Sequence, residues 1–267
     1  MFAFNYHRPE RIEEALMRAR DSGDAKFLAG GQTLIPTLKQ RLAAPGDLID
    51  LGSLPGLAGI EVTPEAVTIG AMTRHADVAA SPEIRRALPA LAALAGLIGD
   101  PAVRNRGTLG GSIANNDPSA DYPSACLALG ATIRTDRRKL PAEAFFRGLF
   151  ETALEEDEIV TAVGFPVPAA AAYRKFANPA SRYAMAGAFV ARTVAGARVA
   201  ITGAGQDGVF RWIEAEDALT VAFTAAALDG LALSADDMIA DMHGDGAYRA
   251  HLAAVMTRRA VAALATG

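Results

Sequence analysis

The sequence predicts an α+β fold with three subdomains, and three kinds of pattern indicate it. Near the N-terminus, apolar residues at helical spacing alternate with short β-prone runs, as in β-α-β units. Further along, β-prone segments 189–194 and 198–202 flank Gly196 and predict an antiparallel pair. Ala-rich stretches with helical character follow this pair. We expect the subdomains to span residues 1–55, 56–168 and 169–267.

The first subdomain begins with apolar residues spaced as in a helix over residues 9–22, and Gly23 is expected to end that helix. Residues 26–29 predict a short strand. Residues 34–42 predict a second helix, with Thr33 as its N-cap. Residues 47–51 predict a further strand, so this region reads as β-α-β units that end in a Ser-Leu-Pro-Gly turn.

The second and third subdomains contain the remaining predicted elements. In the second, Thr73 is expected to cap a helix, and the predicted helices cover residues 75–80, 87–96 and 123–129. Its predicted strands cover residues 57–61, 66–70, 131–135, 139–141 and 158–165. In the third, the Ala-rich helices are expected over residues 215–227, 234–241 and 248–265.

Composition excludes several classes of protein. The 267 residues are 51% hydrophobic, enough for a sizeable core, and carry 26 basic and 30 acidic residues for a net charge of −4. Such mixed charge lacks the basic face of a nucleic-acid-binding protein. Seven charged residues among the first twenty exclude a signal peptide, and no apolar run reaches the length of a membrane helix. We therefore expect a cytoplasmic protein without a membrane span.

Cysteine and histidine residues offer no metal site. The single cysteine, Cys126, excludes an internal disulfide and a cluster bound by four thiolates of this chain. Its predicted helix is apolar, so a buried core residue is expected. The histidines lack metal-ligand spacing, and His7, His243 and His251 are expected to have surface or capping roles. The sequence thus predicts no metal in this chain.

Two pairs of glycines carry the strongest functional signal. Gly30 and Gly31 lie in the segment AGGQT, and Gly110 and Gly111 lie in TLGGS. Consecutive glycines allow successive N–H groups to point the same way and form an anion-binding nest, particularly where a helix begins. Taken singly, the first pair is better explained as an ordinary strand–helix turn. Two nests together predict one ligand with two phosphates, which is a dinucleotide.

A third glycine-rich stretch is expected to have no binding role. Residues 203–208, GAGQDG, match the spacing of a dinucleotide-binding fingerprint and follow a predicted strand. The fingerprint requires a helix after its last glycine, whereas the β-prone residues VFRWI follow here. We therefore expect a glycine-rich loop that leaves a strand.

The second glycine pair lies within a long polar segment, residues 99–121. Few of its residues are typical of a core, and Gly, Asn and Asp are frequent. Long loops without secondary structure are uncommon in compact domains and are often functional. We therefore interpret this segment as a binding loop.

Together with TIGAMT between them at residues 68–73, the two glycine segments resemble the FAD-binding medium subunit of molybdenum hydroxylases, the family of xanthine dehydrogenase and aerobic carbon monoxide dehydrogenase. The resemblance covers nearly the whole chain. It includes FNYHRP at residues 4–9, FFRGLFETAL at 145–154, YRKF at 173–176, GAYR at 246–249 and RRA at 258–260.

This resemblance implies a fold and a cofactor site. The implied fold is of the vanillyl-alcohol-oxidase/PCMH type, with two α/β subdomains and a C-terminal subdomain of antiparallel sheet and helices. FAD would lie between the first two subdomains, with its pyrophosphate on the two glycine segments. Asp121 matches an acidic residue that accepts from hydroxyl groups of the cofactor, and Lys175 matches a lysine near the flavin. The implied FAD-binding residues are Ala29, Gly30, Gly31, Gln32, Thr33, Leu34, Thr73, His75, Ile98, Thr108, Gly110, Gly111, Ser112, Asn115, Asp121, Ile159, Val160, Lys175 and Tyr183.

Several of these positions have simpler interpretations. Ile98, Ile159 and Val160 fit an ordinary core, Lys175 fits a surface strand, and Tyr183 fits either strand packing or cover for the isoalloxazine ring. Thr73 and His75 are included because their segment approaches the cofactor in the family.

The resemblance also implies the activity. It predicts an FAD-containing electron-transfer subunit that takes electrons from two [2Fe–2S] clusters of a small partner subunit. Substrate oxidation would occur at a molybdenum-pterin cofactor in a large partner subunit, within a dimer of heterotrimers. The lone cysteine agrees, because such clusters need thiolates from another chain. The alternatives are a stand-alone FAD oxidase of the same fold and a scaffold that has lost FAD; the intact glycine pairs and Asp121 argue against the scaffold.

Overall fold

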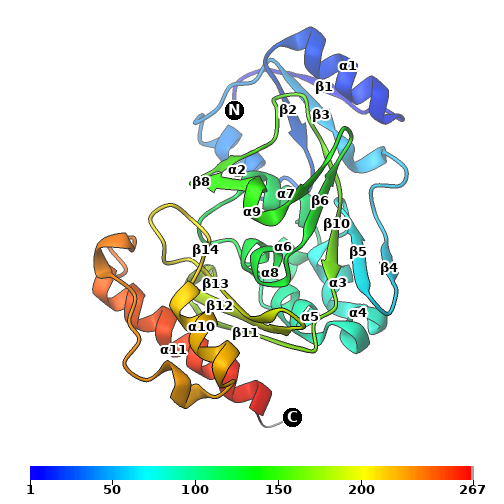
Figure 1. The fold of residues 1–267 in the computed structure, drawn as a ribbon. Helices are drawn as coiled ribbons and strands as arrows, with labels where there is room; N and C mark the ends of the chain where they lie inside the picture. Colours follow the sequence, from blue (N-terminus) through cyan, green and yellow to red (C-terminus); the bar gives the residue numbers. More distant parts are fainter. Residues whose placement is uncertain (266–267) are drawn as a thin grey trace.

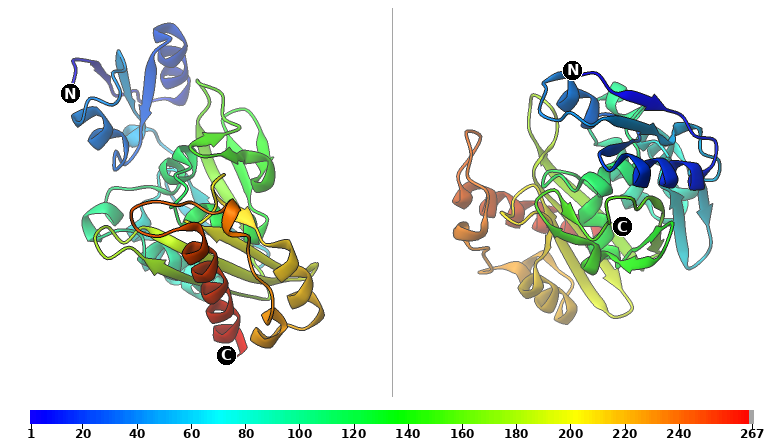
Figure 2. Two further views of the ribbon diagram at one scale, coloured as in Figure 1. Left: turned by 90° about the vertical axis from the view of Figure 1, so that its left-hand side faces the viewer. Right: turned by 90° about the horizontal axis from the view of Figure 1, so that it is seen from above.

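A computed structural model describes residues 1–265 and contains three main sheets that follow one another along the chain, besides a two-stranded one (Figure 1). The first sheet lies at one end of the molecule and the C-terminal helices lie at the other (Figure 2). The predicted boundaries after residues 55 and 168 fall between consecutive sheets, and we use the three subdomains as names for these regions.

The first subdomain contains a small parallel sheet. Its order is β1-β3-β2, with β1 (Asn5–His7), β2 (Ala25–Leu28) and β3 (Asp47–Asp50). Parallel strands need crossover connections: α1 (Ile12–Ser22) connects β1 to β2, and α2 (Leu34–Lys39) lies between β2 and β3. The 3₁₀ helix η1 (Leu51–Ser53) follows β3 directly. Gly23 ends α1 in the left-handed conformation, as predicted, with φ of 64°.

The second subdomain contains an antiparallel sheet of order β4-β5-β10-β6-β7. Its strands are β4 (Ile60–Val62), β5 (Ala66–Gly70), β6 (Thr132–Thr135), β7 (Lys139–Pro141) and β10 (Val160–Pro166), and a separate hairpin pairs β8 (Phe146–Gly148) with β9 (Glu151–Thr152). Its helices are α3 (His75–Ala80), α4 (Pro82–Ala87), α5 (Pro89–Gly96), α6 (Pro101–Arg104), α7 (Leu109–Asn115), α8 (Tyr122–Leu129) and α9 (Ala142–Phe145).

The third subdomain is an antiparallel sheet with helices on both faces. Its strands are β11 (Ala170–Ala177), β12 (Ala184–Thr193), β13 (Gly196–Thr202) and β14 (Phe210–Arg211) in that order. Helices α10 (Ile213–Val221) and α11 (Gly246–Ala265) pack on this sheet, and α5 and α8 of the second subdomain also contact it. The 3₁₀ helices η2 (Ala225–Leu228) and η3 (Ala235–Asp237) connect α10 to α11.

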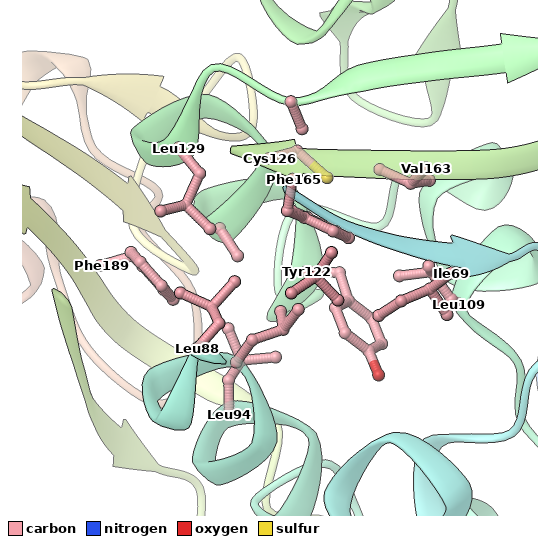
Figure 3. Close-up of a cluster of buried hydrophobic side chains, with 14 of the residues drawn as sticks. Ile69, Leu88, Leu94, Leu109, Tyr122, Cys126, Leu129, Val163, Phe165 and Phe189 are labelled. Carbon is pink, nitrogen blue, oxygen red and sulfur yellow. The ribbon is translucent and has the colours of Figure 1, made fainter. Parts of the chain in front are cut away.

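The second and third subdomains share one apolar core. Its buried residues include Ile69, Leu109, Tyr122 and Phe165 of the second subdomain and Phe189 of β12 in the third (Figure 3). Fully buried Cys126 lies in the same cluster on α8, which confirms its prediction as a core residue. The position of α8, and of the site residues before it, therefore depends on both sheets.

Two details of the prediction are wrong, and one predicted helix is present with a later start. Thr73 does not cap α3: Arg74 precedes the helix, and the Thr73 hydroxyl instead bonds to both backbone groups of Gly59. The helix predicted over 87–96 is confirmed as α5 but begins at Pro89, because Leu88 before the proline is not helical, with φ of −147° and ψ of 65°. The helix predicted over 234–241 is only the short η3.

The structure also bears on the glycine-rich loop 203–208 and on membrane-spanning helices. The loop 203–208 leaves β13 and leads into β14, which confirms that it is not a dinucleotide fingerprint. Among residues 1–265, no helix is long and apolar enough to cross a membrane.

Candidate functional site

A cleft of about 910 Å³ lies between the first and second subdomains, with the third at one end. The first subdomain contributes residues 29–34 and Phe27, the second contributes α7 and the start of β10, and the third contributes Ser181 and Tyr183. This volume lies at the upper end of the range for small-molecule and cofactor sites. Every predicted FAD-binding residue lines the cleft except Thr73 and Lys175.

The first glycine segment forms a donor nest between β2 and α2. Gly31 is left-handed, with φ of 69°, and Thr33 is right-handed. Among the described residues, no acceptor bonds the four successive backbone N–H groups of residues 31–34. Free N–H groups in alternating αL and αR conformations create a concavity for an anion. This segment therefore has the backbone form of an anion-binding nest.

The second glycine segment differs from the prediction. Its polar lead-in contains α6, and the glycines themselves belong to α7, so the segment is not a long irregular loop. The Leu109 N–H donates to Thr73 O, the Gly110 N–H to Ala71 O at 2.7 Å, and the Gly111 N–H to the Thr108 hydroxyl. Protein atoms thus occupy the donors expected to form the second nest.

The two segments nevertheless meet, and glycine makes the contact possible. A Cβ added at Gly30 would lie 2.1 Å from the carbonyl oxygen of Arg106. One added at Gly111 would lie 3.3 Å from the Cβ of Ala29. The nest and the start of α7 are therefore two walls of one cleft, as the hypothesis of a single ligand requires.

Polar side chains without protein partners lie along these walls. The hydroxyls of Thr33 and Ser112 and the amide of Asn115 line the cleft, and none of them bonds to another described residue. Hydroxyls and amides of this kind donate to phosphate oxygens. They complement the backbone nest with side-chain donors.

His75 lines the cleft from α3 and is almost completely buried. Its Nδ1 has no hydrogen-bond partner among the described residues, and its ring lies 5.4 Å from that of Tyr122. Burial, with a smaller effect from Arg104, lowers the pKa of His75 to about 4. At neutral pH the ring is therefore uncharged.

Asp121 and Lys175 form a buried ion pair, and only Asp121 lines the cleft. The Lys175 ammonium lies 2.9 Å from Asp121 Oδ1, donates to Leu97 O and lines a neighbouring pocket of about 290 Å³. Burial raises the pKa of the Asp121 carboxyl, and the Lys175 charge opposes this effect. Lys175 thus lies behind Asp121 as seen from the cleft.

Apolar and aromatic side chains form the rest of the walls. Ile98, Ile159 and Val160 line the cleft. Tyr183 does so too, and its hydroxyl contacts the Asn178 amide at 3.0 Å. Apolar walls with a few convergent polar groups are typical of cofactor sites.

Some lining residues were not predicted. The set includes Met72, Ser119, Phe150, Glu156 and Ser181. Each lies in a turn or loop whose path depends on contacts distant in sequence; Phe150, for example, is positioned by a bond from its N–H to Asn116 O. Local pattern carries no signal for such placements.

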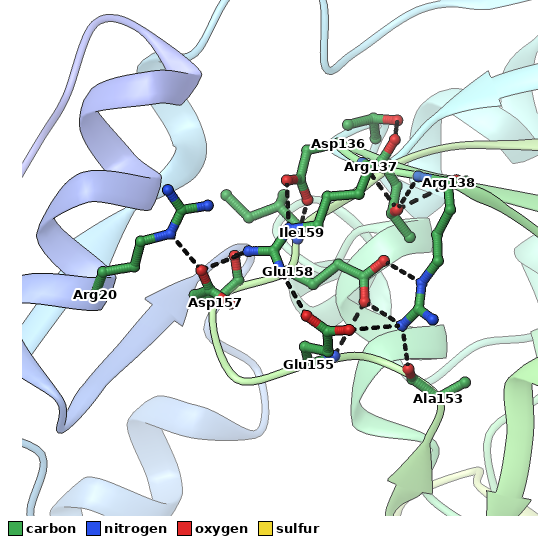
Figure 4. A network of polar contacts seen from close by, with 11 residues as sticks. Arg20, Asp136, Arg137, Arg138, Ala153, Glu155, Asp157, Glu158 and Ile159 are labelled. Carbon is green, nitrogen blue, oxygen red and sulfur yellow. Dashed lines mark hydrogen bonds and ion pairs between the residues drawn. The ribbon is translucent and has the colours of Figure 1, made fainter.

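An ion-pair network fixes the lining segment 154–160 against the first subdomain (Figure 4). Arg20 of α1 and Arg137 of the β6–β7 turn both contact Asp157 at 2.5 Å. Arg138 bonds both oxygens of Glu158, whose side chain is fully buried, at 2.9 and 2.7 Å. The network therefore links the two subdomains beside the cleft.

The residues present fit a dinucleotide such as FAD. The nest supplies anion-binding donors, glycine allows the two walls to approach, and Asp121 is an acceptor buried in the lining. Within residues 1–265, no group of three or more His, Cys, Asp and Glu side chains is placed to bind a metal ion.

Comparison with known proteins identifies the family of the chain. The family described as FAD binding domain in molybdopterin dehydrogenase matches residues 2–168. The chain is 38% identical to the carbon monoxide dehydrogenase medium chain of Hydrogenophaga pseudoflava, over 97% of this chain and 96% of that one. It is 34% identical to the nicotine 6-hydroxylase medium subunit of Paenarthrobacter nicotinovorans, with the same coverage.

Solved structures show the same fold over the whole chain. Carbon monoxide dehydrogenase from Hydrogenophaga pseudoflava superimposes with a TM-score of 0.90 at 37% identity, covering 99% of this chain and 98% of that chain. Quinoline 2-oxidoreductase from Pseudomonas putida 86 gives a TM-score of 0.90 at 30% identity, covering 100% and 98%. The expected PCMH-type α+β fold is thereby confirmed.

Proposed function

The chain belongs to the FAD-binding medium subunits of the molybdenum hydroxylases, and we propose that it holds FAD in the cleft and relays electrons through it. The electrons would come from [2Fe–2S] clusters of a partner subunit and leave to an external acceptor. The chain is thus the flavoprotein component of an oxidoreductase.

One observation carries the proposal most directly. The free N–H groups of residues 31–34 face a cleft whose other wall, α7, approaches them at Gly111. A pyrophosphate between these walls would accept from the nest and from the hydroxyls of Thr33 and Ser112. The Asp121 carboxylate would accept from a hydroxyl or ring N–H of the same cofactor.

The protein's part in the reaction is to bind and orient the cofactor. FAD supplies the redox chemistry, because it accepts electrons singly and releases a pair. Cys126 offers no nucleophile, since burial raises the pKa of its thiol and keeps it protonated. His75 is uncharged at neutral pH and lies in the wall, where it contributes shape and a neutral ring.

Partner subunits supply the other cofactors in this proposal. The relatives include a carbon monoxide dehydrogenase medium chain and subunit alpha of the 6-hydroxypseudooxynicotine dehydrogenase complex, names that denote parts of larger enzymes. We expect a large subunit with a molybdenum-pterin cofactor, a small subunit with two [2Fe–2S] clusters and a dimer of these heterotrimers.

Cofactor analysis and reduction by the partners test the function. The purified chain should release about one FAD per chain on denaturation and should oxidise no substrate alone. Adding the reduced iron–sulfur subunit should bleach the flavin absorbance. Absence of flavin would overturn the binding site, and substrate turnover without partners would instead support a stand-alone oxidase.

A further inference from the structure

A buried polar cluster joins the second and third subdomains beside the cleft. Asp121 immediately precedes α8, whereas Tyr173 and Lys175 come from β11 of the third sheet. The Tyr173 hydroxyl donates to Asp121 Oδ1 at 2.5 Å, and both side chains are buried. Tyr173 does not line the cleft, so any influence on a ligand must pass through Asp121.

The two donors converge on the same carboxylate oxygen. The Lys175 ammonium also contacts Oδ1, at 2.9 Å. No hydrogen bond from another described residue reaches Oδ2, although the backbone N–H of Asp121 itself also stabilises the carboxylate. Because Asp121 lines the cleft, Oδ2 is the oxygen left to accept from a group bound there.

Gly187 of β12 makes room for the Tyr173 hydroxyl. The two residues are on neighbouring strands, and a Cβ added at Gly187 would lie 2.5 Å from the Tyr173 oxygen and 3.2 Å from its ring. Real Cβ atoms do not approach so closely, so any side chain at Gly187 would displace the hydroxyl from Asp121.

We propose that Tyr173, in the space provided by Gly187, is a positioning residue of the cofactor site. It holds Asp121 so that Oδ2 remains free to accept a hydroxyl or ring N–H of FAD. The inference rests on the proposed function and adds to it a tyrosine and a glycine that lie outside the cleft.

The chemistry of a buried carboxylate explains why two donors are needed. Burial favours the protonated form of Asp121, whereas Lys175 and Tyr173 favour the ionised form. A carboxylate held by two donors on one oxygen has a fixed orientation and stays a pure acceptor. Loss of one donor would allow Asp121 to rotate and to take up a proton.

The first test is the Tyr173→Phe variant of the full chain, with FAD affinity measured by quenching of flavin fluorescence. We expect binding to weaken about tenfold, because a hydrogen bond to a charged group is lost. Tyr248→Phe is the matched control. The Tyr248 ring contacts Phe176, which lies on β11 like Tyr173, and among the described residues the Tyr248 hydroxyl has no partner. The control should bind FAD like the wild type.

The second test uses Gly187→Ala, which keeps the hydroxyl but displaces it. Alone, it should weaken FAD binding about as much as Tyr173→Phe. Combined with Tyr173→Phe, it should add little, because both changes break one contact with Asp121. If Tyr173→Phe does not fold, Gly187→Ala measured beside the wild type and Tyr248→Phe decides the question.

The outcomes separate this inference from the function on which it rests. A wild-type chain that binds no FAD would contradict the proposed function. A wild-type chain that binds FAD, with Tyr173→Phe and Gly187→Ala equal to it in affinity, would overturn the inference alone. Additive losses in the double variant would also overturn it, because they would indicate general damage to packing.

Discussion

Gly110 and Gly31 have different structural roles, although each belongs to a pair of glycines. Gly31 adopts a left-handed conformation within the free donor nest. Gly110 is buried in α7, and a Cβ there would lie 2.5 Å from the Cβ of Ala71 and 2.9 Å from its carbonyl oxygen. The glycine at 110 therefore permits α7 to pack on the end of β5, and this packing role adds to its place in the lining of the cleft.

Gly110→Val tests this distinction. The variant should lower the melting temperature of the FAD-free chain by several degrees, because α7 must move away from Ala71. FAD retention should be lost with it. Gly96→Val is a control within α5, where the nearest atom to an added Cβ is 3.9 Å away. An unchanged melting temperature with reduced FAD affinity would contradict the packing role of Gly110. It would indicate instead that the valine side chain occupies the space of the phosphate.

His75 gives stability a pH dependence whose sign follows from its pKa. The pKa of about 4 in the folded chain lies below the ordinary value of 6.5. Between these values the unfolded chain binds a proton that the folded chain does not, so stability falls as the pH falls. From pH 7 to pH 5 this effect amounts to about 2 kcal/mol.

The comparison with His75→Gln isolates that contribution, because all other titrating groups are shared. Urea unfolding at pH 7 and pH 5 should show that the wild type loses about 2 kcal/mol more than the variant over this interval. Equal losses in the two chains would mean that His75 is accessible to protons in the fold.

The segment between β9 and β10 is held by two ion pairs that we expect to contribute unequally to stability. The Glu158 side chain is fully buried, and its hydrogen bonds to Arg138 are the main cause that lowers the pKa of Glu158 to about 2. The Arg20 side chain is 58% exposed in its pair with Asp157. Buried partners are costly to separate, whereas exposed pairs contribute little.

Arg138→Ala should therefore destabilise the chain by about 3 kcal/mol, since it leaves the Glu158 carboxylate buried without its cation. Arg20→Ala should cost at most about 1 kcal/mol. Chemical denaturation at pH 7 measures both. If Arg20→Ala lost more stability than Arg138→Ala, the ion pair between the first two subdomains would contribute more than the buried pair of Glu158.

The elements predicted well from sequence are those with a strong local pattern. The β12–β13 hairpin around Gly196 and α11, predicted from residue 248, are both present. The helix predicted over 234–241 failed because Met238 instead pairs with Gly205 and packs in the core. That pairing joins residues distant in sequence, so no local period reveals it.

The same limit applies to the site. The first nest could be predicted because Gly30 and Gly31 follow a strand directly. That the N–H groups of the second glycine segment are already bonded could not be predicted, because their acceptors are the carbonyl oxygens of Ala71 and Thr73, more than thirty positions earlier. Tyr173 was missed as a site residue because its link to Asp121 crosses from one sheet to another.

At the scale of the whole molecule, the second and third subdomains are expected to unfold together. Phe189 of β12 is fully buried in the core that surrounds α8, and neighbouring Ala188 and Val190 belong to the cluster beneath α11. One strand thus contributes to two cores. Asp121 receives its donors from the third sheet as well.

Phe189→Ala should cost about 3–5 kcal/mol and keep a single unfolding transition, because the cavity affects both regions. Val194→Ala, at a fully exposed position of the same hairpin, should change stability by less than about 0.5 kcal/mol. Calorimetry is the appropriate measurement. Two separate transitions in the Phe189→Ala chain would show that the third subdomain unfolds independently.

In the proposed function, residues 31–34 and the start of α7 hold the pyrophosphate of FAD. Calorimetric titration of the FAD-free chain with FAD, FMN and riboflavin tests it most directly. We expect one FAD per chain, bound much more tightly than riboflavin, with FMN between them, because each phosphate adds acceptors for the nest. Equal affinity for the three flavins would contradict it, since the phosphates would then contribute nothing to binding.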